Sequence, residues 1–210
     1  LYLQQDGFLD KEDRVADDLD PSERPINQHW SWDRILRSVF IKQADVLQGM
    51  YFFEDDFDEA TIRENFLYYE PRTVHESSLS PCVHVVLASK LGMEEKAYEM
   101  YLRTARLDLD DYNHEADEGL HITSMAGTWM AVIEGFGGKR VKDGVLSLDP
   151  MLPKNWNAYR FNLVYRETVL SITVKSEEVM VKNVSGNSLD ILVYGKSVSV
   201  PENETISIGR

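Results

Sequence analysis

The spacing of apolar residues changes near residue 140, and few folds can satisfy both halves of this chain. Before this point apolar residues recur every three or four positions, as on one face of an α-helix. After it they alternate with polar residues, as in half-buried strands. The sequence therefore predicts a multidomain α+β protein, with helices over residues 1–139 and a small antiparallel β-sandwich over residues 140–210.

Five helical segments are predicted in the first region, at residues 32–53, 59–69, 80–91, 94–107 and 122–136. Gln43 falls on the apolar face of the first helix, with Lys42 at the edge of that face. A buried amide without partners costs about 1–3 kcal/mol. A satisfied core glutamine and one that points into a polar pocket are therefore equally expected.

Two of these helices carry informative ends. Ser80 before Pro81 predicts a helix start, with a capping hydroxyl followed by proline at the first helical position. The segment 122–136 is the most apolar of the chain and has almost no polar face, so we expect it to be buried on most sides. This makes it the predicted central helix, with its N-terminus opening into a cleft.

The second region shows no clustered histidines, cysteines or paired acids, and we expect it to act as a packing module. Its predicted strands lie at residues 160–165, 169–174, 179–184, 189–193, 197–200 and 205–208. Hairpin turns are predicted at residues 143–144, 166–167, 185–187 and 195–196.

Composition excludes several classes of protein. The net charge is −14, and no basic stripe interrupts it, which argues against a nucleic-acid or membrane-surface partner. A single cysteine, Cys82, excludes a disulfide framework and a cysteine-based zinc site, and fits a cytoplasmic protein. The acidic segment 107–118 matches no calcium-loop spacing, so a solvated loop is favoured and no metal site is expected. The abrupt start without an initiator methionine favours a piece of a longer protein.

Two small polar clusters carry the chemistry. The first is Tyr-Glu-Pro-Arg-Thr-Val-His-Glu-Ser-Ser-Leu-Ser-Pro at residues 69–81, and the second is Gly-Leu-His-Ile-Thr-Ser-Met-Ala-Gly-Thr-Trp at residues 119–129. Each places a histidine and hydroxyls before an apolar helical run. Unpaired N–H groups at a helix start favour anions, so together the clusters indicate a pocket for a negative ligand. For either cluster alone, ordinary helix capping is the simpler explanation.

These motifs closely resemble the family 65 glycoside hydrolases and phosphorylases, which include maltose, trehalose and kojibiose phosphorylases. Besides the two clusters, the resemblance rests on Lys42-Gln43 before Ala-Asp-Val-Leu, on Gly-Phe-Gly-Gly at residues 135–138, and on Leu-Ser-Leu-Asp-Pro at residues 146–150. Leu-Pro-Lys-Asn-Trp at residues 152–156 extends it into the second region. It covers nearly all of the chain.

The resemblance implies a fold and a reaction. The chain would supply the last helices of a six-hairpin α/α barrel, followed by the C-terminal β-domain. Family members cleave an α-glucosyl disaccharide with inorganic phosphate and inversion, giving β-glucose 1-phosphate and a sugar, without any other cofactor. The general-acid glutamate lies in an upstream motif that is absent here, so we expect this chain to need the missing N-terminal part and to be inactive alone. Family members are often dimers, so a homodimer is also expected.

The same resemblance assigns the site residues. Lys42 and Gln43 correspond to a pair that grips hydroxyls of the glucosyl unit. The residues that correspond to the phosphate pocket are His121, Thr123, Ser124 and Gly127, with Ser77 and Ser78 as further ligands. Glu76 is the acid next to His75 in the first cluster, and it could orient His75 or cap backbone N–H groups.

Three functions stay open at this point. The first is an inverting disaccharide phosphorylase, with maltose as the first substrate considered. The second is a hydrolase of the acid-trehalase type, which would need a second carboxylate to activate water. The third is a non-catalytic carbohydrate-binding or assembly module, which would have little use for a phosphate site.

Overall fold

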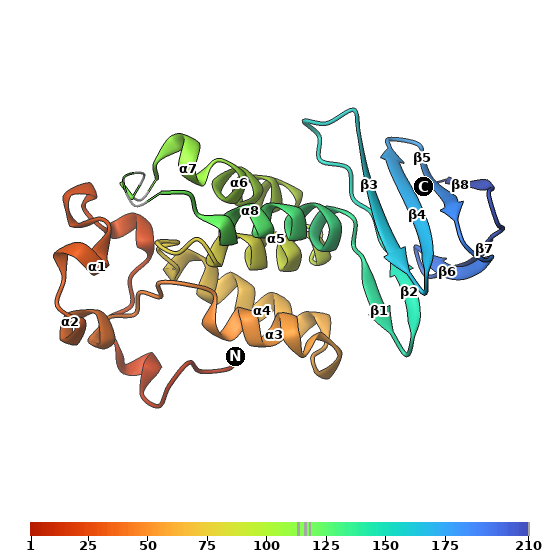
Figure 1. The fold of residues 1–210 in the computed structure, drawn as a ribbon. Helices are drawn as coiled ribbons and strands as arrows, with labels where there is room; N and C mark the ends of the chain where they lie inside the picture. The colour runs from red at the N-terminus through yellow and green to blue at the C-terminus, as the bar shows by residue number, and fades with distance from the viewer. Residues whose placement is uncertain (113, 116, 118, 210) are drawn as a thin grey trace. The chain divides into compact units, whose positions relative to one another are not determined.

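The computed structural model of the protein describes residues 1–112, 114–115, 117 and 119–209, and it divides into two compact units (Figure 1). The first unit, Leu1–Ala131, is helical, and the second, Val132–Arg210, consists mostly of two sheets. The predicted α+β class is therefore confirmed. The domain boundary predicted between residues 139 and 140 coincides with the start of strand β1 (Arg140–Lys142), whereas the compact units divide after Ala131.

The first unit combines short 3₁₀ turns with eight α-helices in the part of the chain that the structure describes. The 3₁₀ turns are Phe8–Asp10, Ala16–Asp18, Pro21–Glu23, Glu54–Asp56 and Glu70–Arg72. The helices are α1 (Ile26–His29), α2 (Trp32–Arg37), α3 (Asp45–Phe52), α4 (Glu59–Tyr69), α5 (Ser80–Lys90), α6 (Glu94–Ala105), α7 (Leu107–Asp110) and α8 (Ile122–Met130).

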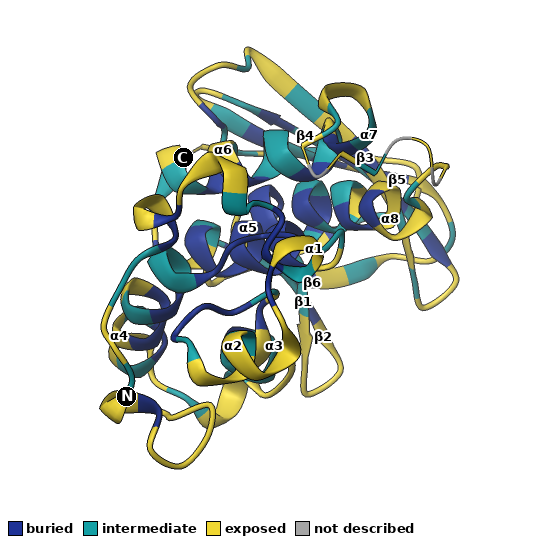
Figure 2. Ribbon diagram, turned by 90° about the vertical axis from the view of Figure 1, so that its left-hand side faces the viewer, coloured by how far each residue is buried: buried dark blue, intermediate teal, exposed yellow. Residues whose placement is uncertain are grey.

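The central helix of this unit is α5, whose residues from Ser80 to Ala88 are all buried (Figure 2). It packs against α3, α4, α6 and α8. Gly92 ends the turn after it with a φ of +69°, a conformation that glycine adopts at no steric cost. The prediction that segment 122–136 would be central was wrong, because α8 buries only one side and continues into a π-helical turn, Ala131–Phe136.

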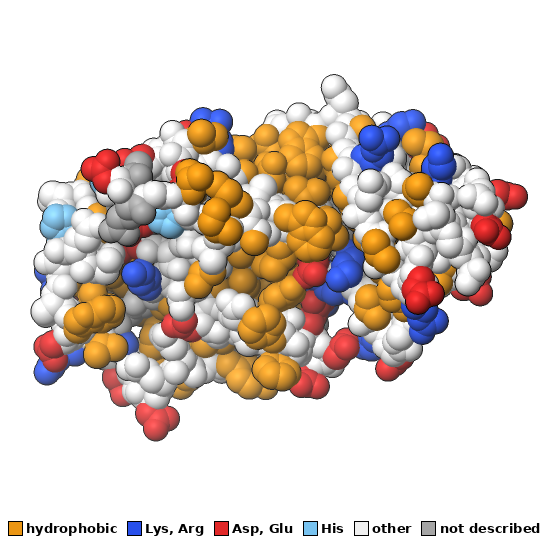
Figure 3. All heavy atoms as spheres, in the orientation of Figure 1, with side chains coloured by type: hydrophobic (Ala, Val, Ile, Leu, Met, Phe, Trp, Pro, Cys, Tyr) orange, Lys and Arg blue, Asp and Glu red, His pale blue; other side chains and the backbone are white. Residues whose placement is uncertain are grey.

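The outer side of α8 is apolar and exposed. Ile122 is 66% exposed, Met125 46% and Trp129 58%. Hydrophobic side chains gather on the face that carries α8 and α3 (Figure 3). The apolar pattern of the segment was thus identified correctly, but none of the residues that the structure describes covers this side.

The single helix predicted over residues 32–53 is also wrong, since α2 and α3 are separate. Val39, Phe40 and Ile41 are buried in succession, and three consecutive residues cannot share one helical face. Ile41 instead forms a parallel bridge with Thr73: its N–H donates to the Arg72 carbonyl at 2.9 Å, and its carbonyl accepts from the Val74 N–H at 2.8 Å. The bridge ties the segment before α3 to the chain that follows α4.

The second unit is a sandwich of two four-stranded sheets. One sheet has the order β1-β2-β6-β7 and the other β3-β4-β5-β8. After β1, the strands are β2 (Val145–Leu148), β3 (Ala158–Tyr165), β4 (Thr168–Lys175), β5 (Glu178–Ser185), β6 (Leu189–Val193), β7 (Lys196–Val200) and β8 (Thr205–Gly209). Buried side chains from both sheets form one core, which includes Leu148, Ile172, Val181 and Val193. The sandwich is mixed rather than antiparallel throughout, because β2 and β6 pair in parallel.

Two-residue turns close the hairpins β1–β2 and β3–β4. Asp143 and Gly144 both have positive φ, as do Arg166 and Glu167. Positive φ at both central positions is the geometry that fits the right-handed twist of the flanking strands. No helix among the described residues is both long and apolar enough to cross a membrane.

Candidate functional site

Three segments that are distant in sequence meet at the start of α8. The Ser77 hydroxyl donates to Gln43 Oε1 at 3.1 Å, and the Ser78 Oγ lies 2.8 Å from the Thr123 Oγ1. Gln43 is exposed, in the link between α2 and α3, so it is neither of the buried glutamines expected from the helical pattern. The neighbouring serines therefore connect a residue predicted to bind sugar with one predicted to bind phosphate.

Contacts of His75 hold the backbone of the serine loop, the segment that carries Ser77 and Ser78. His75 is buried with a φ of +53°, a left-handed conformation that is uncommon outside glycine. The Arg103 guanidinium donates to the His75 carbonyl at 3.1 Å, and His75 Nδ1 lies 3.1 Å from the Ser80 hydroxyl. Ser80 is the first residue of α5, and its hydroxyl pairs with His75. The prediction that this hydroxyl caps the helix was therefore wrong. These contacts leave Ser77 and Ser78 half-buried at the surface.

A second histidine lies under the first. The rings of His75 and His84 are perpendicular, with centroids 4.5 Å apart, and His84 Nδ1 contacts the Ser80 carbonyl at 3.0 Å. Burial lowers the pKa of His84 to about 4. Burial and then the nearby charge of His84 lower the pKa of His75 well below its usual value. Both rings are therefore neutral at pH 7 and act as packing groups.

Glu76 has one of the two roles considered for it. Its Oε2 accepts from the Ile26 N–H at 2.8 Å, at the first residue of α1, so it caps a backbone N–H. Burial raises the pKa of Glu76, while the Ile26 hydrogen bond and the charges of Arg24 and Lys42 act in the opposite direction. Lys42 is half-buried, and its charge acts to lower the pKa of Glu76.

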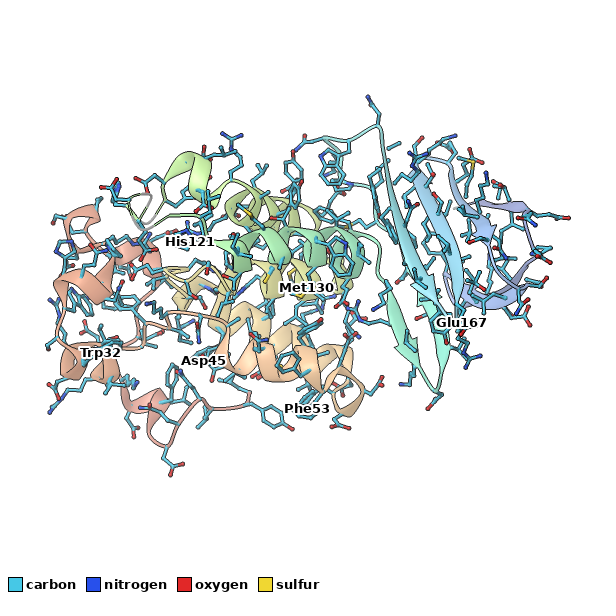
Figure 4. The ribbon with its side chains drawn as sticks, viewed as in Figure 1. Trp32, Asp45, Phe53, His121, Met130 and Glu167 are labelled. Carbon is cyan, nitrogen blue, oxygen red and sulfur yellow. The ribbon has the colours of Figure 1, made fainter. Side chains whose placement is uncertain are left out.

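His121 is held by two acids from the preceding acidic segment. It is the residue before α8, at the opposite end of that helix from Met130 (Figure 4). One Asp108 oxygen lies 2.5 Å from His121 Nδ1, and the other accepts from the His121 N–H at 2.9 Å. Glu115 Oε2 lies 3.6 Å from Nε2. The imidazole is 22% exposed, so a ligand can reach it.

Ser124 and Gly127 lie on the inner side of α8. The Ser124 hydroxyl is buried and donates to the Thr104 carbonyl at 2.7 Å. A Cβ at Gly127 would lie 3.0 Å from Cys82 Cβ and 3.3 Å from Thr104 Oγ1, so this glycine lets α8 approach α5 and α6 closely. Both residues help to seat the helix, and direct phosphate contact through them stays a prediction. Thr123, by contrast, is exposed.

The sequence reasoning missed Asp108, Glu115 and Thr104 as partners of the site. The two acids were counted among the residues of a solvated loop, and no local spacing connects an acid to a histidine 13 positions later. Among the described residues, no group of three or more histidines, cysteines and acids is arranged to hold a metal ion. A separate cavity of about 340 Å³ lies beside α2, where Arg34 and Arg37 pair with Glu23 and Asp33.

Comparison with known families assigns both regions of the chain. Residues 1–130 match the glycosyl hydrolase family 65 central catalytic domain, and residues 140–200 match the glycosyl hydrolase family 65 C-terminal domain. The chain belongs to glycosyl hydrolase family 65. The resemblance inferred from the clusters and from Lys42-Gln43 is therefore confirmed.

Relatives within this family carry several disaccharide phosphorylase names. The chain is 54% identical to the maltose phosphorylase of Bacillus subtilis over 94% of its length, and 39% identical to the α,α-trehalose phosphorylase of Thermoanaerobacter brockii over 97%. A solved structure of a human-microbiome protein described as a candidate kojibiose phosphorylase matches the whole chain with a TM-score of 0.93 and 41% identity, over 28% of that protein's chain. The chain spans only 26% of each of the two curated relatives.

Proposed function

We propose that this chain is part of an inverting disaccharide phosphorylase that cleaves a maltose-like α-glucosyl disaccharide with phosphate. The products are β-glucose 1-phosphate and glucose. The 54% identity to a maltose phosphorylase, against 39% to a trehalose phosphorylase, supports maltose as the substrate. Inorganic phosphate is the co-substrate, and no other cofactor is needed. The proposed location is the cytoplasm.

The observation that carries the proposal is the serine pair. Ser77 contacts Gln43 and Ser78 contacts Thr123, so the two ends of the expected active site are adjacent. In this proposal Lys42 and Gln43 bind hydroxyls of the glucosyl unit. His121, Thr123 and the serines bind phosphate, while Ser124 and Gly127 set the position of α8. Phosphate held beside the sugar can then attack the anomeric carbon directly.

The reaction also needs a proton donor for the leaving oxygen, and we infer that it comes from sequence outside this chain. The exposed side of α8, with Ile122, Met125 and Trp129, is the surface against which the rest of an α/α barrel would pack. On this proposal the first unit is the end of a six-hairpin barrel. Residues 1–210 alone should release no glucose 1-phosphate.

The test is the phosphate dependence of the complete enzyme and of its His121→Ala variant. Loss of a hydrogen bond to a charged group costs about 1.5–3 kcal/mol, so the KM for phosphate should rise on the order of 10- to 100-fold. The KM for maltose should change less than about twofold. His29→Ala, which alters an exposed histidine of α1, is the control. Equal loss for both substrates would mean that His121 is structural.

One observation favours the hydrolase alternative. Asp108 and Glu115 place two carboxylates around His121, and a hydrolase needs a carboxylate that can activate water. Turnover of the complete enzyme at the same rate without phosphate would overturn the phosphorylase proposal and support this second function.

A further inference from the structure

We propose that Asp108 is the positioning residue that fixes the tautomer and orientation of His121, so that Nε2 faces the phosphate. This inference rests on the proposed function. Asp108 would touch neither substrate. It would act through the imidazole, as carboxylates behind ligand-binding histidines do at metal centres.

Asp108 contacts His121 at two points, one on the ring and one on the backbone. One carboxylate oxygen of Asp108 contacts the ring at Nδ1, 2.5 Å away, and the other accepts the backbone N–H of the same residue at 2.9 Å. A ring held together with its own backbone has little freedom about its side-chain torsions. The contacts therefore fix where Nε2 points, on the side of the ring away from Asp108.

The chemistry of the carboxylate also selects the proton position. An ionised carboxylate only accepts hydrogen bonds, so Nδ1 must carry a proton. Hydrogen bonds from the His121 side chain and then from its N–H keep the pKa of Asp108 below its usual value, so the group is ionised at pH 7. With Nδ1–H engaged by Asp108, Nε2 is the nitrogen left for the ligand: it donates to an anion when it carries a proton and accepts from a P–OH group when it does not.

Asp108 is itself held in a fixed place. It belongs to α7, which follows α6 directly, and the adjacent Leu107 is only 5% exposed. Two residues further along, Asp110 forms a bidentate pair with the Arg106 guanidinium at 2.7 and 2.8 Å. This second acid of the same short helix pairs with Arg106 and provides a matched control.

Two acids face the imidazole in the described part of the chain: Asp108 lies at Nδ1 and Glu115 at Nε2. Glu115 faces the nitrogen that the proposal assigns to phosphate. The roles of the two acids therefore differ, since Asp108 supports the ring from behind and Glu115 lies on the side that the anion approaches.

The kinetic test uses Asp108→Asn and Asp110→Asn in the complete enzyme. The two donors of His121 contact different oxygens of Asp108, so an asparagine in the same place would turn its NH₂ group toward one of them and lose that hydrogen bond. We expect Asp108→Asn to raise the KM for phosphate about tenfold, within the range for such supporting carboxylates. The KM for maltose should change less than about twofold. Asp110→Asn should resemble the wild type.

A second measurement needs no variant. Nitrogen NMR of the wild-type 210-residue chain should show that the neutral His121 ring carries its proton on Nδ1. A neutral His121 that carries its proton on Nε2 in the wild type would overturn the proposal. So would a wild-type phosphate KM in Asp108→Asn. If the complete enzyme ignores phosphate while the NMR result holds, the proposed function fails and the Asp108–His121 geometry survives.

Discussion

The two polar clusters look alike in sequence, but they have different environments in the fold. Each has a histidine, hydroxyls and an apolar helix after them. In the first, His75 is 6% exposed and lies on His84 under the serine loop. In the second, His121 is 22% exposed and is held by acids from a surface segment. One histidine supports a backbone, while the other presents a ring nitrogen.

The difference shows what a histidine needs in order to handle an anion. A ring that stays neutral, as His75 and His84 do, cannot balance a negative ligand. A ring that is partly exposed, as that of His121 is, can be reached by a ligand. Both clusters contain a histidine and hydroxyls, so burial decides which of the two histidine rings is open to a ligand.

The largest expected effect is the acid sensitivity of the first cluster, which contains the buried His75 and packs on His84. In the unfolded chain His84 takes up a proton near pH 6.5, whereas in the folded chain its pKa is about 4. The stability contributed by the neutral His84 should be fully present above pH 6.5. The free energy of unfolding should then fall by about 3 kcal/mol as the pH approaches 4. The lowered pKa of His75 acts in the same direction, and the raised pKa of Glu76 acts against it.

Urea unfolding of the 210-residue chain between about pH 7 and pH 4.5 measures this slope. The slope should be shallower in His84→Gln, while the exposed His29→Gln should follow the wild type. Identical slopes in all three proteins would show that the burial of His84 does not cause the acid sensitivity. Burial would then not explain why the first cluster differs from the second.

A smaller effect is expected where α8 approaches its neighbours. Gly127→Ala places a methyl group 3.0 Å from Cys82 Cβ and should destabilise the chain by about 1–2 kcal/mol. Gly49→Ala, in the middle of α3, meets no atom within 4 Å and should stabilise it by about 0.5–1 kcal/mol. Chemical denaturation of both variants checks this contrast. Stabilisation by Gly127→Ala would mean that α8 is seated loosely and that the second cluster is more mobile than described.

The smallest effect concerns Glu115, which lies beside His121 of the second cluster. Its carboxylate lies 3.6 Å from His121 Nε2 and competes there with an incoming anion. Glu115→Gln should therefore lower the KM for phosphate about two- to fivefold in the complete enzyme, in line with a partly exposed ion pair. Asp17→Asn, the same charge change on an exposed residue of another element, is the control. A higher phosphate KM in Glu115→Gln would show that this acid supports phosphate binding.

Local signals in the sequence predicted much of the fold. The helix at residues 59–69 has the predicted bounds, because Asp58 caps the Thr61 N–H and Pro71 follows the end. The six strands predicted after residue 158 are also present, within one or two residues at most ends. Alternation and turn residues are read from neighbouring positions, so tertiary contacts are not needed to find them.

Non-local contacts account for what the sequence did not reveal. The break between α2 and α3 depends on a bridge from Ile41 to Thr73, and the parallel pairing of β2 with β6 joins segments more than 40 residues apart. The apolar pattern of α8 identified the segment but not what covers it. For the site, the role of His121 stays a prediction from the sequence, and its contact with Asp108 exists only once the chain is folded.

The two neighbouring serines have a consequence for how strongly the binding of one substrate affects the binding of the other. Ser77 and Ser78 share one peptide bond, and they reach Gln43 and Thr123 respectively. If sugar binds at Gln43 and phosphate at Thr123, a ligand that fixes either serine lowers the entropy cost of fixing the other. Thermodynamic linkage then requires the effect to be reciprocal: phosphate would tighten sugar binding by the same factor by which sugar tightens phosphate binding.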